Sequence, residues 1–246
     1  NIGTEVINHL VKQNSDSKII AGVRTIETAK ENFFEHPNLS FRKFNFENKS
    51  TFDLAFESID ILFLLRPPHL SDVTKFFKPL LISAKKYGIK KVVFLSVQGA
   101  EKSKIIPHNK IERLVKEIGF QYIFVRPSYF MQNITTTLLP EIVCEKTITL
   151  PSGNGKFNWI DAQNIGEATA LLIQSFDKYK NNYFEITGDT NADFNEVTSI
   201  LSKVLGVKIT FKSINPISFY LKKRKQGIAN GFAIVMTILH FLPRIQ

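Results

Sequence analysis

Short apolar runs of strand length alternate with segments of helical periodicity over the first 150 residues, and this alternation constrains the fold more than any other feature. Strands that alternate with helices in this way form βαβ units, in which each helix connects two parallel strands. Strands are expected at residues 18–23, 40–45, 60–65, 90–96 and 121–126, and helices at residues 4–13, 51–57, 71–87 and 108–118. The sequence therefore predicts an α/β fold built on a doubly wound parallel sheet.

The alternation becomes less regular toward the C-terminus, which predicts a smaller α/β lobe. Residues 128–144 are expected to be helical, Gly153 and Gly155 mark a turn, and a strand at 183–187 is expected between helices at 161–176 and 195–205. We therefore predict a first domain at residues 1–150 and a smaller, partly helical lobe at residues 151–246.

One apolar segment, residues 227–242, resembles a membrane anchor because it follows the basic run 222–225. Its sixteen residues are fewer than the roughly 20 that a helix needs to cross a bilayer. Asn230, Thr237 and His240 also interrupt it. A buried helix of the C-terminal lobe is the favoured interpretation.

Composition narrows the classes of partner. The net charge of +10 is spread along a chain rich in Lys, Asn, Ile and Phe, which indicates a general compositional bias rather than nucleic-acid binding. The single cysteine, Cys144, excludes an internal disulfide, and the five histidines lack zinc-ligand spacing. We expect a cytoplasmic protein with a small-molecule substrate, compatible with a homodimer, and with neither a nucleic acid nor a membrane as partner.

The start of the chain matches the second half of a dinucleotide-binding βαβ unit. Gly3 opens a helix and fits the last glycine of a Rossmann glycine-rich turn, beside Ile2, while the first strand and part of that turn are expected to be missing. Arg24 follows the next strand, 21 residues after Gly3 (24 − 3 = 21). At this position a carboxylate selects NAD, whereas an arginine accommodates the 2′-phosphate of NADP. Arg24 therefore favours NADP(H) over NAD(H), although an exposed loop arginine would look the same.

Ligands of open α/β sheets bind beyond the carboxyl ends of the strands. Asn45 is expected either to bond the adenine amino group or to cap the following turn, and Arg66 either to lie over the pyrophosphate or to be a surface charge. The predicted cofactor residues are Ile2, Gly3, Arg24, Asn45, Phe46, Leu65, Arg66, Pro67, Ser96, Val97, Gln98, Lys110, Pro127, Ser128 and Phe130, and the predicted substrate residues are Tyr129, Met131 and Asn133.

Several stretches of the chain carry a family resemblance. They are Gly-Val-Arg at 22–24, Leu-Leu-Arg-Pro-Pro at 64–68, Phe-Leu-Ser-Val-Gln-Gly-Ala-Glu at 94–101, Pro-His-Asn-Lys-Ile-Glu at 107–112, Arg-Pro-Ser-Tyr-Phe-Met-Gln-Asn at 126–133 and, more loosely, residues 151–155 and 161–165. Through them the chain resembles the NmrA-like, atypical short-chain dehydrogenase/reductase family. The resemblance implies an NAD(P)-binding Rossmann domain, a quinone reductase or a cofactor-sensing regulator, and truncation of this chain at both ends.

The sequence also departs from the wider superfamily, which uses a serine and a tyrosine four residues before a lysine. Lys110 matches the lysine and Ser96 ends the corresponding strand, but Ile106 stands where the tyrosine is expected. Asn45 and Asn164 replace residues that are usually aspartates in relatives. Loss of the tyrosine removes a proton-transfer group that contributes ~10²- to 10⁴-fold to alcohol chemistry.

Reduction of a quinone or similar electron-poor substrate suffers less from this loss, because water can protonate the product. We therefore predict an NAD(P)H-dependent oxidoreductase with Lys110 as its catalytic residue. The alternative is a regulatory protein that senses NADP(H) without turnover.

Overall fold

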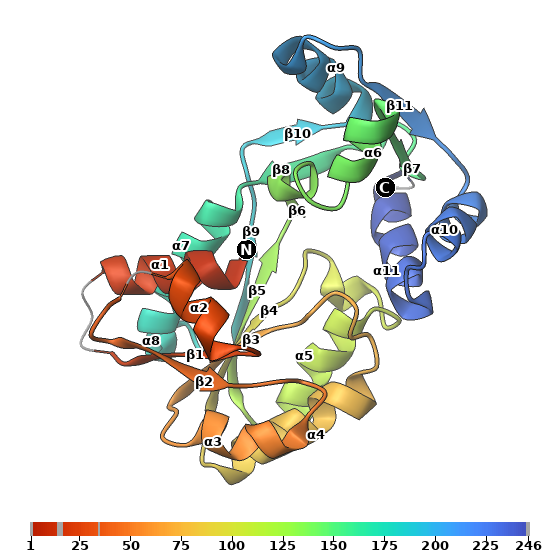
Figure 1. Ribbon diagram of the computed structural model, residues 1–246. Helices are drawn as coiled ribbons and strands as arrows, with labels where there is room; N and C mark the ends of the chain where they lie inside the picture. Colours follow the sequence, from red (N-terminus) through yellow and green to blue (C-terminus); the bar gives the residue numbers. More distant parts are fainter. Residues whose placement is uncertain (1, 14–16, 34, 245–246) are drawn as a thin grey trace. The chain divides into compact units, whose positions relative to one another are not determined.

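The protein is described here by a computed structural model that defines residues 2–13, 17–33 and 35–244 (Figure 1). These residues form two compact units, each described by itself below. Unit 1 contains the described residues within 1–66, 72–127 and 162–186, and unit 2 contains those within 67–71, 128–161 and 187–246.

The centre of unit 1 is a parallel four-stranded sheet with the order β3-β4-β5-β9. Its strands are β3 (Ile61–Leu65), β4 (Lys91–Leu95), β5 (Gln121–Pro127) and β9 (Asn182–Ile186). A second parallel sheet pairs β1 (Ile19–Val23) with β2 (Leu39–Lys43). The predicted α/β fold with a parallel sheet is confirmed.

The helices of unit 1 are α1 (Ile2–Lys12), α2 (Ile26–Asn32), α3 (Phe52–Phe56), α4 (Val73–Lys86), α5 (Pro107–Glu117), α7 (Ala162–Gln174) and α8 (Phe176–Tyr179), with 3-10 turns η1 (Lys49–Thr51) and η2 (Ala100–Lys102). Helices α2, α3, α4 and α5 connect successive strands of its two sheets, whereas α1 precedes β1 and α7 and α8 precede β9. α1 packs on α7 so closely that a Cβ atom on Gly166 would overlap the Cβ atom of Glu5. Gly119, with φ of +81°, ends the turn after α5 in the left-handed conformation that glycine favours.

Unit 2 is built on short strands around an aromatic core. Its sheets are β10 (Thr190–Ala192), β8 (Phe157–Ile160) and β6 (Tyr129–Phe130), and separately β11 (Thr210–Ser213) with β7 (Thr147–Leu150). Its helical elements are η3 (Met131–Asn133), α6 (Leu139–Glu145), α9 (Phe194–Leu205), α10 (Pro216–Lys225), α11 (Asn230–Phe241) and η4 (Leu242–Arg244). The core is centred on Phe157, Trp159, Phe194 and Phe219, and Tyr129 packs against it.

Most predicted elements appear within two residues of their expected bounds, but residues 128–144 do not form one helix. Tyr129 pairs with Trp159 of β8, so the segment begins as a strand. Pro140 then sits in the first turn of α6, where its missing N–H costs nothing. Sequence patterns did not predict the helices α2 and α10 or the strands β7, β8, β10 and β11. The strands are too short to establish a period.

The compact units differ from the predicted division at residue 150. The chain enters unit 2 at Ser128, returns to unit 1 for α7 and β9, and enters unit 2 again at Thr187. β9 returns because it pairs with β5 in the central sheet. A pairing between distant segments leaves no mark in local composition, so a single linear boundary was the natural prediction.

The apolar segment at 227–242 contains α11, which has 12 residues. Ala233, Val235, Met236 and His240 of this helix are buried. Within residues 2–13, 17–33 and 35–244, no helix combines the length and the apolar character needed to cross a membrane.

Candidate functional site

A row of polar residues stands at the carboxyl edge of the central sheet. The strand register aligns Leu65 with Leu95 and Leu95 with Val125. The next residues along the three chains are Arg66, Ser96 and Arg126. Because side chains alternate between the two faces of a sheet, these three share one row and one face. The edge where a nucleotide is expected therefore carries two arginines and a serine.

Helix α5 brings two more polar residues to this row. His108 and Glu112 are four residues apart and so lie on one face of the helix. The Arg66 Nε atom donates to His108 Nε2 over 3.3 Å, and Ser96 Oγ donates to Glu112 Oε1 over 2.6 Å. The first helical position is Pro107, and no side chain caps the N-terminus. We call Arg66, Ser96, His108, Glu112 and Arg126 the edge cluster.

The ion pair between Glu112 and Arg126 is the strongest interaction of the edge cluster. Arg126 Nε and Nη2 donate to the two carboxylate oxygens over 3.0 and 2.7 Å, and the side chains are only 5% and 4% exposed. Arg126 Nη1 also lies 2.7 Å from Glu101 Oε2, and the guanidinium stands over the Tyr183 ring. Burial alone would lower the pKa of Arg126, but the bonds to Glu112 outweigh it and hold the pKa above its usual value.

Ser96 has a structural partner that the sequence did not reveal. Its hydroxyl hydrogen is donated to Glu112, and its backbone N–H bonds Val125 O over 2.7 Å. A hydroxyl has one donor and two acceptor lone pairs, so Ser96 can still accept a hydrogen bond from a ligand. Its predicted cofactor contact stays a prediction, restricted to that acceptor role.

Arg66 and His108 form a buried pair of a permanent cation and a neutral ring. Burial lowers the pKa of Arg66 to about 10. Burial, and secondly the Arg66 charge, lower the pKa of His108 to about 3, so the imidazole is neutral near neutral pH. The prediction for Arg66 left open a surface charge, but its side chain is buried.

Arg24 keeps the accessibility that a phosphate-binding residue needs. It directly follows β1 and is exposed. No hydrogen bond or ion pair of Arg24 is present among the residues that the structure defines. The planar guanidinium can therefore present two parallel donors to a phosphate, which fits the predicted 2′-phosphate contact.

Asn45 and Phe46, predicted to contact the adenine end, have local partners. Asn45 Oδ1 accepts the backbone N–H of Glu47 over 3.0 Å, and its own N–H bonds Thr51 Oγ1 over 3.0 Å. This is the turn-capping role that the sequence left open. Phe46 packs against Phe44 and against Phe77 of α4, with ring centroids 4.9 and 5.5 Å apart.

The remaining predicted residues of unit 1 lie near element ends. Gln98 Nε2 donates to Glu185 Oε2 over 3.0 Å, and the Gln98 backbone N–H bonds Pro127 O over 3.0 Å. The others hold the positions expected from the chain: Ile2 and Gly3 in the first turn of α1, Leu65 and Pro127 at the last positions of β3 and β5, and Val97 in the turn after β4.

Lys110 does not join the edge cluster. It is exposed, and it lines a shallow groove on the helical surface whose other residues are Val73, Thr74, Lys78, Arg113, Leu114 and Glu117. Lys110 lies 200° around α5 from both His108 and Glu112 at 100° per residue, which turns it away from the row at the sheet edge. This geometry places Lys110 away from the edge cluster, and its predicted catalytic and cofactor roles stay predictions.

The other predicted residues belong to unit 2: Pro67, Ser128, Tyr129, Phe130, Met131 and Asn133. Ser128 Oγ donates to Asn158 Oδ1 over 2.8 Å. Tyr129 packs against the aromatic core. Pro67 and Phe130 are half-buried. Met131, at 40% exposed, is the most accessible of the three predicted substrate residues.

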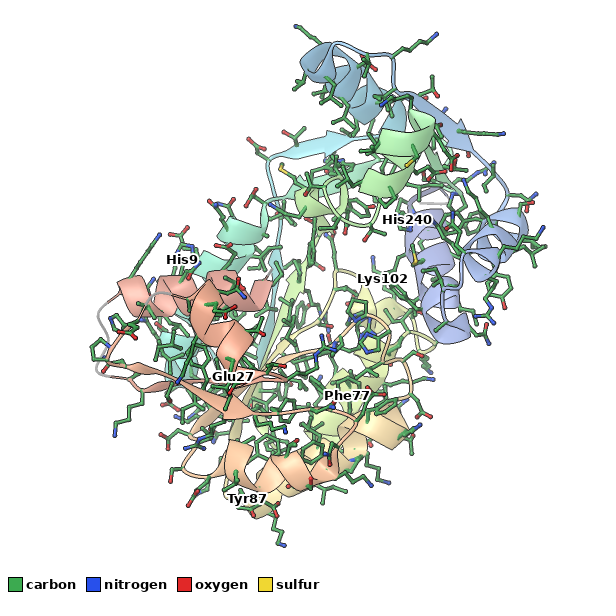
Figure 2. All side chains as sticks on the ribbon, in the orientation of Figure 1. His9, Glu27, Phe77, Tyr87, Lys102 and His240 are labelled. Atoms are coloured by element: carbon green, nitrogen blue, oxygen red, sulfur yellow. The ribbon has the colours of Figure 1, made fainter. Side chains whose placement is uncertain are left out.

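A buried histidine in the core of unit 2 fixes the Tyr129 hydroxyl. His240 lies on α11 (Figure 2), and its Nδ1 is 2.7 Å from Met236 O, which can only accept. His240 Nε2 therefore accepts from the Tyr129 hydroxyl over 2.9 Å. Burial raises the pKa of Tyr129 and lowers that of His240 to about 4, with a smaller lowering from the nearby Lys223 charge.

His240 should make stability fall with acid. Its folded pKa lies below the ordinary 6.5, so below pH 6.5 the unfolded chain binds a proton that the folded protein excludes. Between pH 7 and pH 5 this removes about 2 kcal/mol of stability. Urea unfolding at both pH values should show a smaller decrease for His240→Gln, which keeps a donor and an acceptor. Equal decreases for both proteins would contradict a neutral His240.

The sequence analysis missed three members of the edge cluster: His108, Glu112 and Arg126. The five histidines are scattered along the chain, which gives no metal-ligand signal, yet His108 and Glu112 have the four-residue spacing of a shared helix face. Arg126 is part of the family-resembling stretch at 126–133, but the sequence predicts no function for its side chain. Over the described residues, no group of three His, Cys, Asp or Glu side chains is arranged to hold a metal ion.

Comparisons with known proteins agree with this architecture. The prestalk A differentiation protein A of Dictyostelium discoideum is 28% identical over 232 residues, which cover 94% of this chain and 75% of that protein. The NAD(P)H azoreductase of Xenophilus azovorans is 27% identical, over 78% of this chain and 68% of that protein. The NADPH-dependent quinone oxidoreductase of Escherichia coli, solved with NADPH, superimposes with a TM-score of 0.81 at 18% identity, covering 98% of this chain and 85% of that chain.

A family model confirms the resemblance found in the sequence. The model of the NmrA-like family matches residues 1–240, which is nearly the whole chain. The match includes the edge cluster, the Arg24 strand end and both compact units. The chain therefore belongs to the NmrA-like family.

Proposed function

We propose that this protein is an NADPH-dependent oxidoreductase that reduces a quinone or another small, electron-poor substrate by hydride transfer. The observation that carries the proposal is Arg24, an exposed guanidinium without a protein partner among the described residues, at the strand end where NADP is distinguished from NAD. The names of two relatives, an NAD(P)H azoreductase and an NADPH-dependent quinone oxidoreductase, support the same chemistry.

The residues present fit the adenine-side phosphate of this cofactor. No Asp or Glu lies between Ile19 and Thr25, so nothing in this segment repels a phosphate near Arg24. When bound, the dinucleotide supplies the hydride. Arg24 would hold the 2′-phosphate, and Arg66 would lend positive charge at the edge of the central sheet.

The substrate class follows from the group that is missing from α5. Ile106 occupies the position before Pro107 and is 2% exposed, so an apolar side chain fills the place of the expected tyrosine. The described residues of this turn thus offer no phenol to transfer a proton to an alkoxide. A substrate whose reduced oxygen is a weak base, such as a hydroquinone, can take its proton from water instead.

The proposal is tested by steady-state oxidation of NADPH with a panel of benzoquinones, naphthoquinones and azo dyes. We expect turnover with at least one quinone and weaker turnover with NADH. NADPH binding without turnover of any acceptor would favour the regulatory alternative, in which cofactor occupancy is sensed. Failure to bind either dinucleotide would overturn both functions.

The substitution Lys110→Met distinguishes two expectations for Lys110. One is the catalytic role predicted from the sequence, and the other is the exposed surface position that the structure shows. The catalytic interpretation predicts at least a tenfold fall in kcat/KM with a quinone, which is ~1.4 kcal/mol of transition-state stabilisation. The exposed position in the groove predicts a change of less than about twofold, because a surface charge contributes little. We expect the second result in steady-state kinetics, with thermal unfolding as a control for folding. A tenfold fall in kcat/KM would instead support the catalytic role of Lys110.

A further inference from the structure

The edge cluster contains a buried hydrogen-bond donor that no described residue satisfies. His108 is 7% exposed, and its Nδ1 atom has no hydrogen-bond partner within the described part of the chain. A buried polar group without a partner costs free energy, so such groups are rare and point to a ligand or a function. His108 is therefore the first place to look for an unassigned contact.

The hydrogen bond from Arg66 determines what His108 can bind. Arg66 Nε always carries its hydrogen, so His108 Nε2 must be the acceptor of their 3.3 Å bond. In the neutral ring the hydrogen is then on Nδ1. The unsatisfied atom is thus an N–H donor, and its missing partner is an acceptor.

Two further features at the same position favour a negatively charged acceptor. Arg66 is a buried guanidinium in contact with the ring. The first turn of α5, an 11-residue helix, begins at Pro107 and receives no side-chain cap, so the positive end of its dipole is uncompensated there. Asn109 Nδ2 donates to Ala100 O over 3.0 Å, which holds this turn in place. An N–H donor, a cation and a helix N-terminus together match an oxyanion.

We propose that His108 Nδ1–H, Arg66 and the first turn of α5 bind an oxyanion at the carboxyl edge of the central sheet. Two sources share this chemistry: the pyrophosphate of the dinucleotide, and the oxygen of the substrate during reduction. The second source rests on the function proposed above.

The substrate step balances without a protein acid. A bound dihydronicotinamide would supply a hydride, together with the electron pair of its C–H bond, to the quinone. The quinone is reduced and its oxygen becomes an oxyanion, while the nicotinamide is oxidised. His108 Nδ1–H donates a hydrogen bond to that oxygen and keeps its proton, and water protonates the hydroquinone anion. A fixed donor of this kind acts by stabilising charge that develops in the transition state.

Two substitutions of His108 isolate the donor. His108→Asn places an amide N–H where Nδ1–H stands, whereas His108→Phe fills the same space without a donor. Both substitutions remove His108 Nε2, which accepts the hydrogen bond from Arg66. The difference in ligand affinity or kcat/KM between the two variants therefore measures the contribution of the Nδ1–H donor alone. Arg113→Met is the matched control, because Arg113 lies on the same helix and is 62% exposed.

Three measurements are made, the first two on wild type and on each variant after thermal unfolding has shown that it is folded, and the third on wild type alone. They are titration with NADPH and with inorganic pyrophosphate, kcat/KM with a quinone, and the ¹⁵N resonance of His108 Nδ1 in wild type on addition of either ligand. We expect His108→Phe to lose at least tenfold in one of the first two, His108→Asn to stay within about threefold of wild type, and Arg113→Met to be unchanged.

The outcomes identify the source of the oxyanion. Loss of NADPH and pyrophosphate affinity with a shift of the Nδ1 resonance assigns the cofactor pyrophosphate. Loss of kcat/KM at unchanged cofactor affinity assigns the substrate oxygen. The proposal is wrong if His108→Phe matches wild type in both, or if His108→Asn is as impaired as His108→Phe. A protein that binds NADPH without any turnover would overturn the proposed function, while the titrations would still decide whether His108 binds an oxyanion.

Discussion

Replacing Arg126 with methionine should lower the free energy of unfolding by about 3–5 kcal/mol. The substitution leaves the Glu112 carboxylate buried, and among the described residues the Ser96 hydroxyl is then its one remaining hydrogen-bond donor. Breaking a buried ion pair by removing one partner is costly because the remaining charge has neither water nor a counter-ion. Urea unfolding at neutral pH measures the effect directly, provided that wild type and variant unfold with the same slope.

Two comparisons show whether burial is the cause of this cost. Arg113→Met breaks the exposed pair with Glu117, whose side chains are both 62% exposed, and should cost no more than about 1 kcal/mol. Adding Glu112→Met to Arg126→Met removes the stranded charge and should recover part of the stability. A loss below about 1 kcal/mol for Arg126→Met alone would show that the edge cluster does not stabilise the fold.

Replacing Arg24 with alanine should weaken NADPH binding by about 1.5–3 kcal/mol while leaving NADH binding nearly unchanged. In the proposed function the guanidinium would form charge-assisted hydrogen bonds with the 2′-phosphate, a group that NADH lacks. Because Arg24 is exposed and has no partner among the described residues, its removal should not alter stability. Titration of each variant with both dinucleotides gives the ratio of affinities, which should fall by roughly 10- to 150-fold.

Lys30→Ala is the control for a general effect of positive charge, because Lys30 is an exposed cation on α2, the helix that follows Arg24. It should change the ratio of affinities less than about twofold. Equal losses of NADPH and NADH affinity in Arg24→Ala would remove the assignment to NADP(H). In that case Arg24 would be an ordinary charge of the loop after β1.

Sequence reasoning was most successful where the signal is local. The strands at 61–65 and 91–95 and the helix at 107–117 were predicted closely, because apolar period and flanking glycine or proline are properties of neighbouring residues. The exposed position of Arg24 after β1 was likewise predictable from the strand end. Asn45 could be narrowed to two roles, and the structure shows the capping one.

The edge cluster shows what sequence reasoning could not supply. Ser96, Glu112 and Arg126 are joined by hydrogen bonds, although Ser96 follows β4, Glu112 lies on α5 and Arg126 lies on β5. Glu112 is 16 residues from Ser96 and 14 residues from Arg126 in the sequence. The sequence contained a serine, a helix and an Arg-Pro stretch, each with several conceivable partners. Which partner each one meets depends on the strand register, since a shift by one residue turns a side chain to the opposite face.

By itself, the sequence determined the parallel α/β architecture through its periodicity and the family through its motif stretches, because both are encoded along the chain. It also singled out Arg24 at a strand end, whose contact with the phosphorylated cofactor stays a prediction. Only the tertiary structure decided that α5 presents His108 and Glu112 to the sheet edge while Lys110 lines an exterior groove. Two residues along a helix turn by 200°, so neighbours such as His108 and Lys110 face different surroundings. Which of them faces the sheet is determined by how the helix packs, and packing is a property of the whole fold.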